Sequence, residues 1–586
     1  MSDSDIYSLK TWDETMLATL KFSDFILDSR RFELRRGERI LKLEKIPMEL
    51  LILLAEREGD LVSRDEIVEK LWGKDVFIEA DRSINTAVSK LRVALRDNPE
   101  RPQYIQTVVG KGYRFIASIS QPQSPQTLAV LPFKPLSNGS SDEYLELGMA
   151  DTLITKLSRS GRLIVRPTSA IRKYTGVDCE TLAAGRALQV DAVLEGNIQH
   201  VGSQLRVSIR LIRVRDGLSL WSDSYDARFT DVFQVQDTVS ERVVDALALH
   251  LSNLEKAGLR KRYTADVQAY ELYMRGIFFW NKRNEDGLRK AVLYFEQAIA
   301  IDDHYALAHA GLAAALNPLG YLGYGAPDEV RPKIRATATQ AVTLDPALPE
   351  AHVAMAAALA FYEWNWLEGE REFQRALELN PNLSLAHHWY AMLLQCCGRY
   401  EEALKHRQRA MELDPVTPII VCALGDALSL LAEYERALPA FRKALELDTS
   451  LDQARVGIGY VYEQRGEYES AIPEYRLAVE QSPGSRLARS ALGHALARAG
   501  ATSEAQQILN DLITLSRTEH VSPFHLAIIC AGLGDDESAL NWIEKAYDQS
   551  DSAISGLSVE PRFRTLRTHP RCRSLLRRMR LGDTDS

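Results

Sequence analysis

The second half of this 586-residue chain repeats itself every 34 residues, and this period constrains the fold more than any other feature. Two series of alanines keep the interval: Ala403, Ala437, Ala471, Ala505 and Ala539, and Ala376, Ala410, Ala444 and Ala478. Asn380-Pro381 and Asp414-Pro415 close two of the units, where proline cannot continue a helix. A period of this length predicts stacked helix pairs, with alanine where two helices cross closely.

The repeating units resemble tetratricopeptide repeats. The small residue of the family's first helix matches Ala391, Gly425, Gly459 and Gly493, and the aromatic residue of its second helix matches Phe295, Phe373, Phe441 and Tyr475. Arg407 departs from this pattern. We expect about seven repeats over residues 266–550, with a longer inter-helix loop near Gly320 to Lys333 and an Arg-rich tail over 551–586. Such solenoids bind protein segments on concave surfaces, and scaffolding or self-association is the alternative role.

The N-terminal segment has a different pattern. Short apolar stretches between Phe22 and Leu43 predict strands, and a helix is expected to begin at Pro47. Ser63-Arg-Asp-Glu66 is a capping box that opens a second helix. A third helix is expected from Asp81, and the residues from Tyr104 to Ile116 predict a terminal hairpin that turns at Gly110-Lys111.

The third helix has two distinct faces. Ile84, Val88, Leu91 and Leu95 form an apolar stripe, and polar or basic residues lie opposite. From Arg82 to Phe115 there are seven basic and two acidic residues, an excess of five positive charges. Local positive charge supplies most non-specific DNA affinity, and short polar side chains on a helix suit the major groove. A solvated amphipathic helix is the alternative interpretation of this segment alone.

Three motifs give the segment a more specific resemblance. Residues 64–73, 82–95 and 104–115 resemble the OmpR/PhoB-type winged-helix effector domain. The resemblance implies that Asp81 to Arg96 is the recognition helix, that the hairpin around Lys111 is the wing, and that the loop from Gly73 to Ala80 contacts RNA polymerase. The implied DNA-binding residues are Arg82, Asn85, Thr86, Ser89, Lys90, Arg92, Thr107, Lys111 and Arg114. The family often has a basic residue where this chain has Val109, and Lys111 is the nearby substitute.

A polar linker at 119–126 precedes a third segment, 127–252, whose alternating strands and helices predict a small α/β domain. Its last helix is expected from Phe233 to Leu251. The motifs at 128–133 and 194–198 resemble the TolB amino-terminal-like domain. No phosphate-binding loop or catalytic constellation is found in the sequence, so we expect neither an enzyme nor a cofactor or metal. Arg206 and Arg210 share a polar strand face and are candidates for anion binding.

Composition narrows the protein class further. The net charge of -9 excludes a uniformly basic nucleic-acid coat. The first residues are acidic and polar, which is unlike a signal peptide, and the uncharged stretch from His304 to Pro327 holds too many glycines and prolines for a membrane span. The six cysteines show no metal-binding spacing and are expected to be reduced and mostly buried.

Together these features predict a multidomain protein: an α+β winged helix at 20–118, the α/β domain, and an all-α tetratricopeptide-repeat solenoid. We expect a cytoplasmic transcriptional regulator that binds double-stranded DNA, with RNA polymerase as a partner and homodimerisation by analogy with tandem half-sites. The input is expected through the middle or repeat domains, because only about twenty residues precede the winged helix and no receiver domain does. The alternative is a repeat-based adaptor whose winged helix contacts proteins.

Overall fold

The computed structural model places the chain in two compact units, residues 1–124 and 125–586. It describes residues 19–28, 32–36, 39–57, 59–73, 80–117, 125–135, 143–159, 161, 163–175, 180–201, 204–249, 251, 253–282 and 284–581. Across these ranges, every helix is too short or too polar to cross a bilayer. Cys396, Cys422, Cys530 and Cys572 are buried free thiols and Cys397 is half-buried. Cys179 lies outside the described residues.

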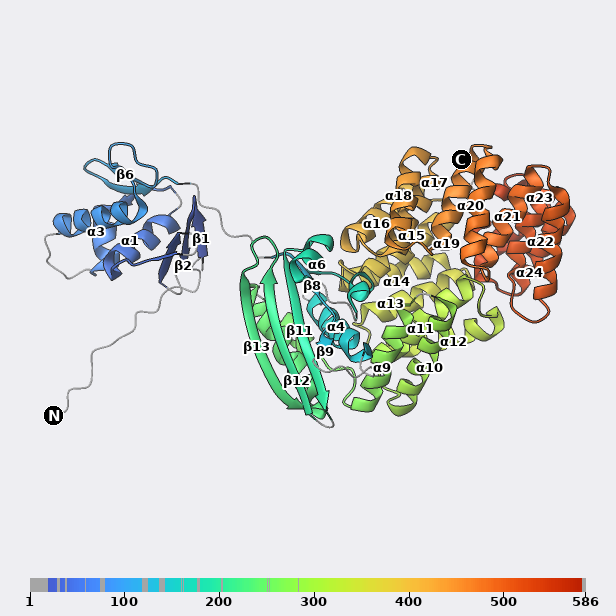
Figure 1. The fold of residues 1–586 in the computed structure, drawn as a ribbon, viewed down its shortest axis with the longest axis horizontal. Coiled ribbons are helices and arrows are strands. Elements are labelled where there is room, and N and C mark those ends of the chain that lie inside the picture. The colour runs from blue at the N-terminus through green and yellow to red at the C-terminus, as the bar shows by residue number, and fades with distance from the viewer. Residues whose placement is uncertain are drawn as a thin grey trace. The chain divides into compact units, whose positions relative to one another are not determined.

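The first unit is a winged helix with an added N-terminal sheet (Figure 1). Its elements are β1 (Thr19–Phe22), β2 (Phe25–Asp28), β3 (Glu33–Arg36), β4 (Arg39–Leu41), α1 (Lys45–Glu56), β5 (Val62–Ser63), α2 (Arg64–Leu71), α3 (Ala80–Leu95), β6 (Ile105–Val108) and β7 (Gly112–Phe115). The first four strands form an antiparallel meander, and β7 pairs with both β5 and β6. Helix α1 begins two residues before the expected Pro47, because proline is tolerated throughout a first helical turn.

Aromatic side chains join the two sheets of this unit. Phe22 packs against Phe25, Tyr104 and Phe115 with ring centroids 4.9–5.8 Å apart. The apolar stripe of α3 is buried against this core, as its spacing predicted. Gly112 is needed where β7 meets β5, because an added Cβ would lie 2.0 Å from the Val62 carbonyl oxygen. The hairpin is therefore held against the core at its base.

The second unit begins with the α/β domain. Its elements are β8 (Thr127–Val130), β9 (Lys134–Pro135), α4 (Glu143–Ser158), β10 (Ile164–Val165), α5 (Thr168–Ile171), α6 (Thr181–Ala187), β11 (Ala192–Val201), β12 (Gln204–Arg213), β13 (Ser219–Arg228), α7 (Val232–Ala246) and α8 (Asn253–Arg260). The sheet order is β10-β8-β11-β12-β13, with β9 beside β11. The expected helix from Phe233 to Leu251 is too long: α7 ends at Ala246, and Ala248 adopts a φ of 53°, which a helix cannot continue.

Helices α9 to α24 follow as antiparallel pairs that stack into a solenoid (Figure 1). Their bounds are α9 (Val267–Trp280), α10 (Glu285–Ile301), α11 (Ala306–Tyr321), α12 (Pro327–Leu344), α13 (Pro349–Ala357), α14 (Trp366–Leu379), α15 (Ser384–Cys396), α16 (Tyr400–Leu413), α17 (Pro418–Leu430), α18 (Tyr434–Leu447), α19 (Asp452–Gln464), α20 (Tyr468–Gln481), α21 (Arg486–Arg498), α22 (Thr502–Leu515), α23 (Pro523–Leu533) and α24 (Asp536–Asp548). The described residues thus form eight pairs, one more than the approximate count from the sequence.

Two details of the solenoid differ from the pattern expected from the sequence. A π-helical turn at Ala358–Tyr362 lies between α13 and α14, so this pair departs from the 34-residue spacing. The loop expected near Gly320 to Lys333 is shorter than that range: residues 322–326 join α11 to α12, against three residues at 397–399, 431–433 and 465–467 in later pairs. Helix α11 runs through Pro318 to Tyr321, and α12 begins at Pro327 and contains Pro332. Buried Val330 and Ile334 hold that part of α12 against the core, and this packing outweighs the lost backbone hydrogen bond.

The chain after α24 is folded against the solenoid rather than forming a tail apart from it. It contains short 3-10 helices at Ser552–Gly556, Pro561–Phe563 and Leu566–Thr568, followed by α25 (Pro570–Arg578). Phe563, Cys572 and Leu575 are buried in the solenoid core. The Trp366 indole nitrogen donates a 2.7 Å hydrogen bond to the carbonyl oxygen of Met579.

The α/β domain is docked onto the solenoid within the second unit. The Arg166 guanidinium donates hydrogen bonds of 2.7 Å to the carbonyl oxygens of Glu412 and Leu413. The Ser169 hydroxyl donates at 2.8 Å to Asp414. These bonds satisfy carbonyl groups at the end of α16, which otherwise have no partner within the helix.

Candidate nucleic-acid interface

Helix α3 presents a continuous exposed stripe to solvent, polar except for Val93 at its end. Arg82, Asn85, Thr86, Ser89 and Lys90 are all exposed, and Val93 extends the stripe with 77% of its surface exposed. Their spacing of three and four residues puts them on one helical face, opposite the buried stripe. A 16-residue helix that offers short polar side chains between two cations has the dimensions and chemistry that a DNA major groove accepts.

The base of this helix is fixed by a cluster around Arg64, which the sequence analysis did not single out. The Arg64 guanidinium donates to Asp81 at 2.5 Å, and to Asn85 Oδ1 and the Tyr113 hydroxyl at 3.2 Å. The Tyr113 hydroxyl also donates to Asn85 Oδ1, at 2.7 Å. Asn85 is therefore oriented by its own domain through its oxygen, and its amide N–H₂ group is the part that can donate to a partner.

Arg92 on α3 and Thr107 on β6 contact each other. One terminal nitrogen of Arg92 donates to the Ile105 carbonyl oxygen at 2.9 Å and to Thr107 Oγ1 at 2.8 Å. Asp97 is buried and accepts hydrogen bonds from the backbone N–H groups of Gln103 and Ile105 at 2.7 and 2.8 Å. One of the two acidic residues in this basic segment thus anchors the first wing strand and does not oppose DNA on the surface.

The other predicted residues differ in their partners. Lys90 Nζ donates to both carboxylate oxygens of Glu44 at 2.7 Å, and both side chains of this ion pair are largely exposed. The Thr86 hydroxyl donates back to the Arg82 carbonyl oxygen at 2.8 Å. Lys111 is exposed at the hairpin turn and Arg114 is half-buried on β7. An exposed pair such as Lys90–Glu44 contributes less than about 1 kcal/mol, so a phosphate can replace the carboxylate at little cost.

Sequence comparisons agree with this geometry. Residues 37–115 match the family described as transcriptional regulatory protein, C terminal. The first unit contains an OmpR/PhoB-type winged-helix domain. Residues 124–242 match the second domain of HilA/YgeH-like transcriptional regulators, in the segment that we compared with the TolB amino-terminal-like domain. Residues 372–405, 420–450 and 462–519 match tetratricopeptide repeats.

Individual relatives cover parts of the chain. The transcriptional regulator HilA of Salmonella typhimurium is 23% identical over 66% of this chain and 68% of its own length. A Rhizobium meliloti protein provisionally named adenylate cyclase 3 is 30% identical, over 45% of this chain and 46% of its own length. The crystal structure of the Klebsiella pneumoniae RstA DNA-binding domain with the RstA box is 32% identical, covering 17% of this chain and 95% of that one, with a TM-score of 0.16.

Other candidate sites in the sequence have ordinary partners. Arg206 pairs with Asp226 at 2.5 Å and Arg210 with Glu195 at 2.5 Å, so both candidate anion-binding residues are already in contact with carboxylates. Among the described residues, Asp302, Asp303 and His304 are close enough together to hold a metal ion. His304 and Asp303 are exposed and bond to each other, and Asp302 accepts a 2.5 Å hydrogen bond from Thr264.

Proposed function

We propose that this protein is a cytoplasmic transcriptional regulator that binds double-stranded DNA by placing α3 in the major groove. The exposed stripe from Arg82 to Val93 is the observation that carries this proposal. Its two cations can contact phosphates, while Asn85, Thr86 and Ser89 lie between them where base edges would be. Lys111 at the hairpin turn is the wing residue that can reach the adjacent groove. The chromosome lies in the cytoplasm of bacteria such as those of the relatives, which supports that location.

Two partners extend the proposal. The loop between α2 and α3 would contact RNA polymerase; residues 74–79 of this loop lie outside the described residues. Binding as a homodimer to tandem half-sites would place two copies of α3 in successive turns of the groove. The second unit would supply signal input by binding a ligand or a protein, and would not catalyse a reaction. The matches of residues 37–115 and 124–242 to domains of transcriptional regulators support DNA binding by the first unit and regulation through the second.

The proposal is tested by gel shift with a triple variant, Arg82→Ala, Ser89→Ala and Lys90→Ala, of the full chain. We expect the loss of DNA affinity to exceed about 100-fold, and the slope of log affinity against log salt to fall by about two, one for each cation removed. Arg39→Ala, an exposed arginine on the N-terminal sheet, is the control and should bind as the parent does. Unchanged affinity and slope in the triple variant would favour the adaptor alternative.

A further inference from the structure

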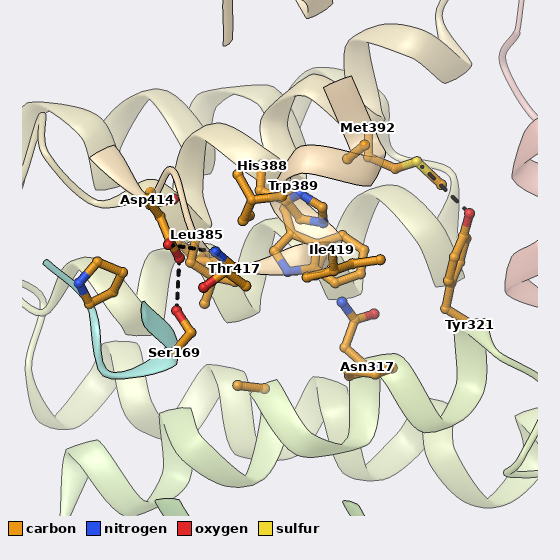
Figure 2. Close-up of a pocket in the computed structure, with 18 of the residues that line it drawn as sticks. Ser169, Asn317, Tyr321, Leu385, His388, Trp389, Met392, Asp414, Thr417 and Ile419 are labelled. Carbon is orange, nitrogen blue, oxygen red and sulfur yellow. Dashed lines mark hydrogen bonds between the residues drawn. The ribbon is translucent and has the colours of Figure 1, made fainter. Parts of the chain in front are cut away.

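The second unit contains a cavity of about 570 Å³ that the DNA-binding proposal does not use. Its walls come from the first helices of successive pairs, mainly α11, α13, α15, α17 and α19. Helices α4 and α5 of the α/β domain close one part of it, and residues 556–562 after the solenoid close another. Figure 2 shows Asn317 and Tyr321 on α11 facing Trp389 and Met392 on α15. Cavities of about 300–1,000 Å³ hold drug-sized ligands.

Most of the cavity wall is apolar and aromatic. Trp280, Tyr321, Trp389 and Tyr460 are half-buried side chains that line it, together with Leu385 and Ile419. Figure 2 places Trp389 and Ile419 in the middle of the hollow. Aromatic rings attract cations to their faces, by about 0.5–2 kcal/mol each.

Unpaired oxygen atoms point to a ligand that donates hydrogen bonds. Asn317 is 4% exposed, and its Oδ1 atom has no hydrogen-bond partner among the described residues. Glu350 Oε2 on α13 and Gln453 Oε1 on α19 are likewise buried without a partner. All three residues line the cavity. A buried acceptor without a partner costs about 1–3 kcal/mol, so a ligand that supplies N–H groups would recover that cost.

The charge of the lining favours a cation. Five carboxylates line the cavity, against the two guanidinium groups of Arg407 and Arg562: Asp151, Glu350, Asp414, Asp426 and Glu560. Arg562 is bound to Glu463 at 2.9 and 3.0 Å. Arg407, which replaces the family's aromatic residue, donates into the wall, to His388 at 2.8 Å and to Gln395 at 2.6 Å. Arg562 is therefore paired with a carboxylate, whereas the partners of Arg407 are neutral and its charge acts on Asp426.

Asp426 is the carboxylate that remains available. It has no hydrogen bond or ion pair with any described residue, its side chain is exposed, and it is among the residues lining the hollow. Surrounding protein desolvates the carboxyl and raises its pKa to about 6, although the positive charge of Arg407 opposes the shift. Above that pH the cavity wall carries a carboxylate that has no hydrogen-bond donor among the described residues and whose charge Arg407 offsets only in part, which favours an opposite charge in the ligand.

We propose that this cavity binds a small organic cation, an amine with an apolar or aromatic body, whose charged nitrogen contacts Asp426. The ammonium group would donate to the unpaired oxygens, and the apolar body would lie against the joined rings of Tyr321 and Trp389, whose centroids are 6.2 Å apart, and against Ile419. A carboxylate ligand would be repelled by Asp426, and a neutral apolar ligand would leave the charge and the acceptors uncompensated. The binding proposal does not depend on DNA recognition, and each can fail separately.

The test compares three probes of nearly equal shape: 3-phenylpropylamine, 3-phenylpropanol and 3-phenylpropanoate. Isothermal titration into the full chain near pH 8 should give an affinity for the amine at least about tenfold higher than for the alcohol, with no measurable binding of the carboxylate. The proposal is wrong if the alcohol or the carboxylate binds as tightly as the amine. It is also wrong if the amine fails to bind at concentrations up to about 10 mM.

Variants locate the binding. Asp426→Asn keeps the shape and removes the charge, so amine affinity should fall about tenfold while that of the alcohol stays unchanged. Asp511→Asn, an exposed carboxylate on α22 outside the cavity lining, is the matched control. Asn317→Ala removes one unpaired acceptor and should also weaken amine binding. It provides a second test of the site if thermal melting shows that Asp426→Asn does not fold. Amine affinity that is unchanged in every folded cavity variant would overturn the proposal.

Discussion

The cations on α3 of the first unit and those that line the cavity of the second unit differ in their exposure to solvent. On α3, Arg82 and Lys90 are exposed, and the carboxylate of Glu44 opposite Lys90 is itself largely in solvent. In the second unit, Arg407 is 3% exposed and the side chain of Arg562 is 4% exposed, each surrounded by protein acceptors. Exposed cations keep their hydration and can exchange one anion for another. Buried ones are committed to a fixed partner, because losing it leaves a charge in a poorly solvated space.

The buried pair should therefore give the largest effect. Replacing Arg562 with Met leaves Glu463 without its guanidinium, and we expect the second unit to lose about 3–5 kcal/mol of unfolding free energy. Differential scanning calorimetry should show the transition of this unit shifting down while that of the first unit stays in place. Arg371→Ala breaks the exposed pair with Glu368 and should cost less than about 1 kcal/mol. Equal decreases in transition temperature for the two variants would show that buried and exposed arginines contribute alike to stability.

A second prediction concerns Arg64, a cation of the first unit that holds neighbouring side chains in position. Arg64→Met would release Asp81, Asn85 and Tyr113, so we expect DNA affinity to fall about tenfold, equivalent to about 1.4 kcal/mol. The salt slope should stay unchanged, since no phosphate contact is lost. A slope lower by about one, measured in the same titrations, would instead show that Arg64 contacts DNA itself.

The smallest effect concerns the wing. Val109 is 90% exposed just before Gly110, at the position where the family often has a basic residue. Val109→Arg should raise DNA affinity by a few fold and increase the salt slope by about one. Val109→Gln, which is polar but uncharged, should leave the slope at the parental value. If both substitutions act alike, the wing turn does not lie near a phosphate.

Features that repeat or alternate locally could be predicted from the sequence. The buried stripe of α3, the capping bond of 3.1 Å from the Glu66 N–H to Ser63 Oγ, and the packing of Gly425 and Gly459 under Phe441 and Tyr475 all follow from residues close in sequence or one repeat apart. Prolines were a less reliable guide to where helices begin and end. Pro318 and Pro332 lie inside helices because tertiary packing holds those turns, and one sequence does not reveal such packing.

The candidate sites also differ in how far local sequence patterns predict them. The positions of the nine predicted DNA-binding residues could be read from one helix and one hairpin, although their role remains a prediction. The hydrogen bonds of Arg64 to Asn85 and Tyr113 join residues 21 and 49 positions apart and gave no local signal. The cavity joins residues from Asp151 to Arg562. Arg407, which replaces the aromatic residue of the repeat pattern, is the one cavity residue that the sequence analysis marked as unusual.

The closure of the cavity by residues 556–562 has a consequence for synthesis. This segment leaves the ribosome after every helix that it covers, whereas the DNA-binding unit ends more than 400 residues earlier. At roughly 5–20 residues per second, a nascent chain would carry a finished winged helix for at least about 20 seconds before its ligand chamber could close. If the proposed DNA binding and amine binding are correct, newly made molecules would be able to bind DNA before the cavity is complete, and the rate of translation would set the interval.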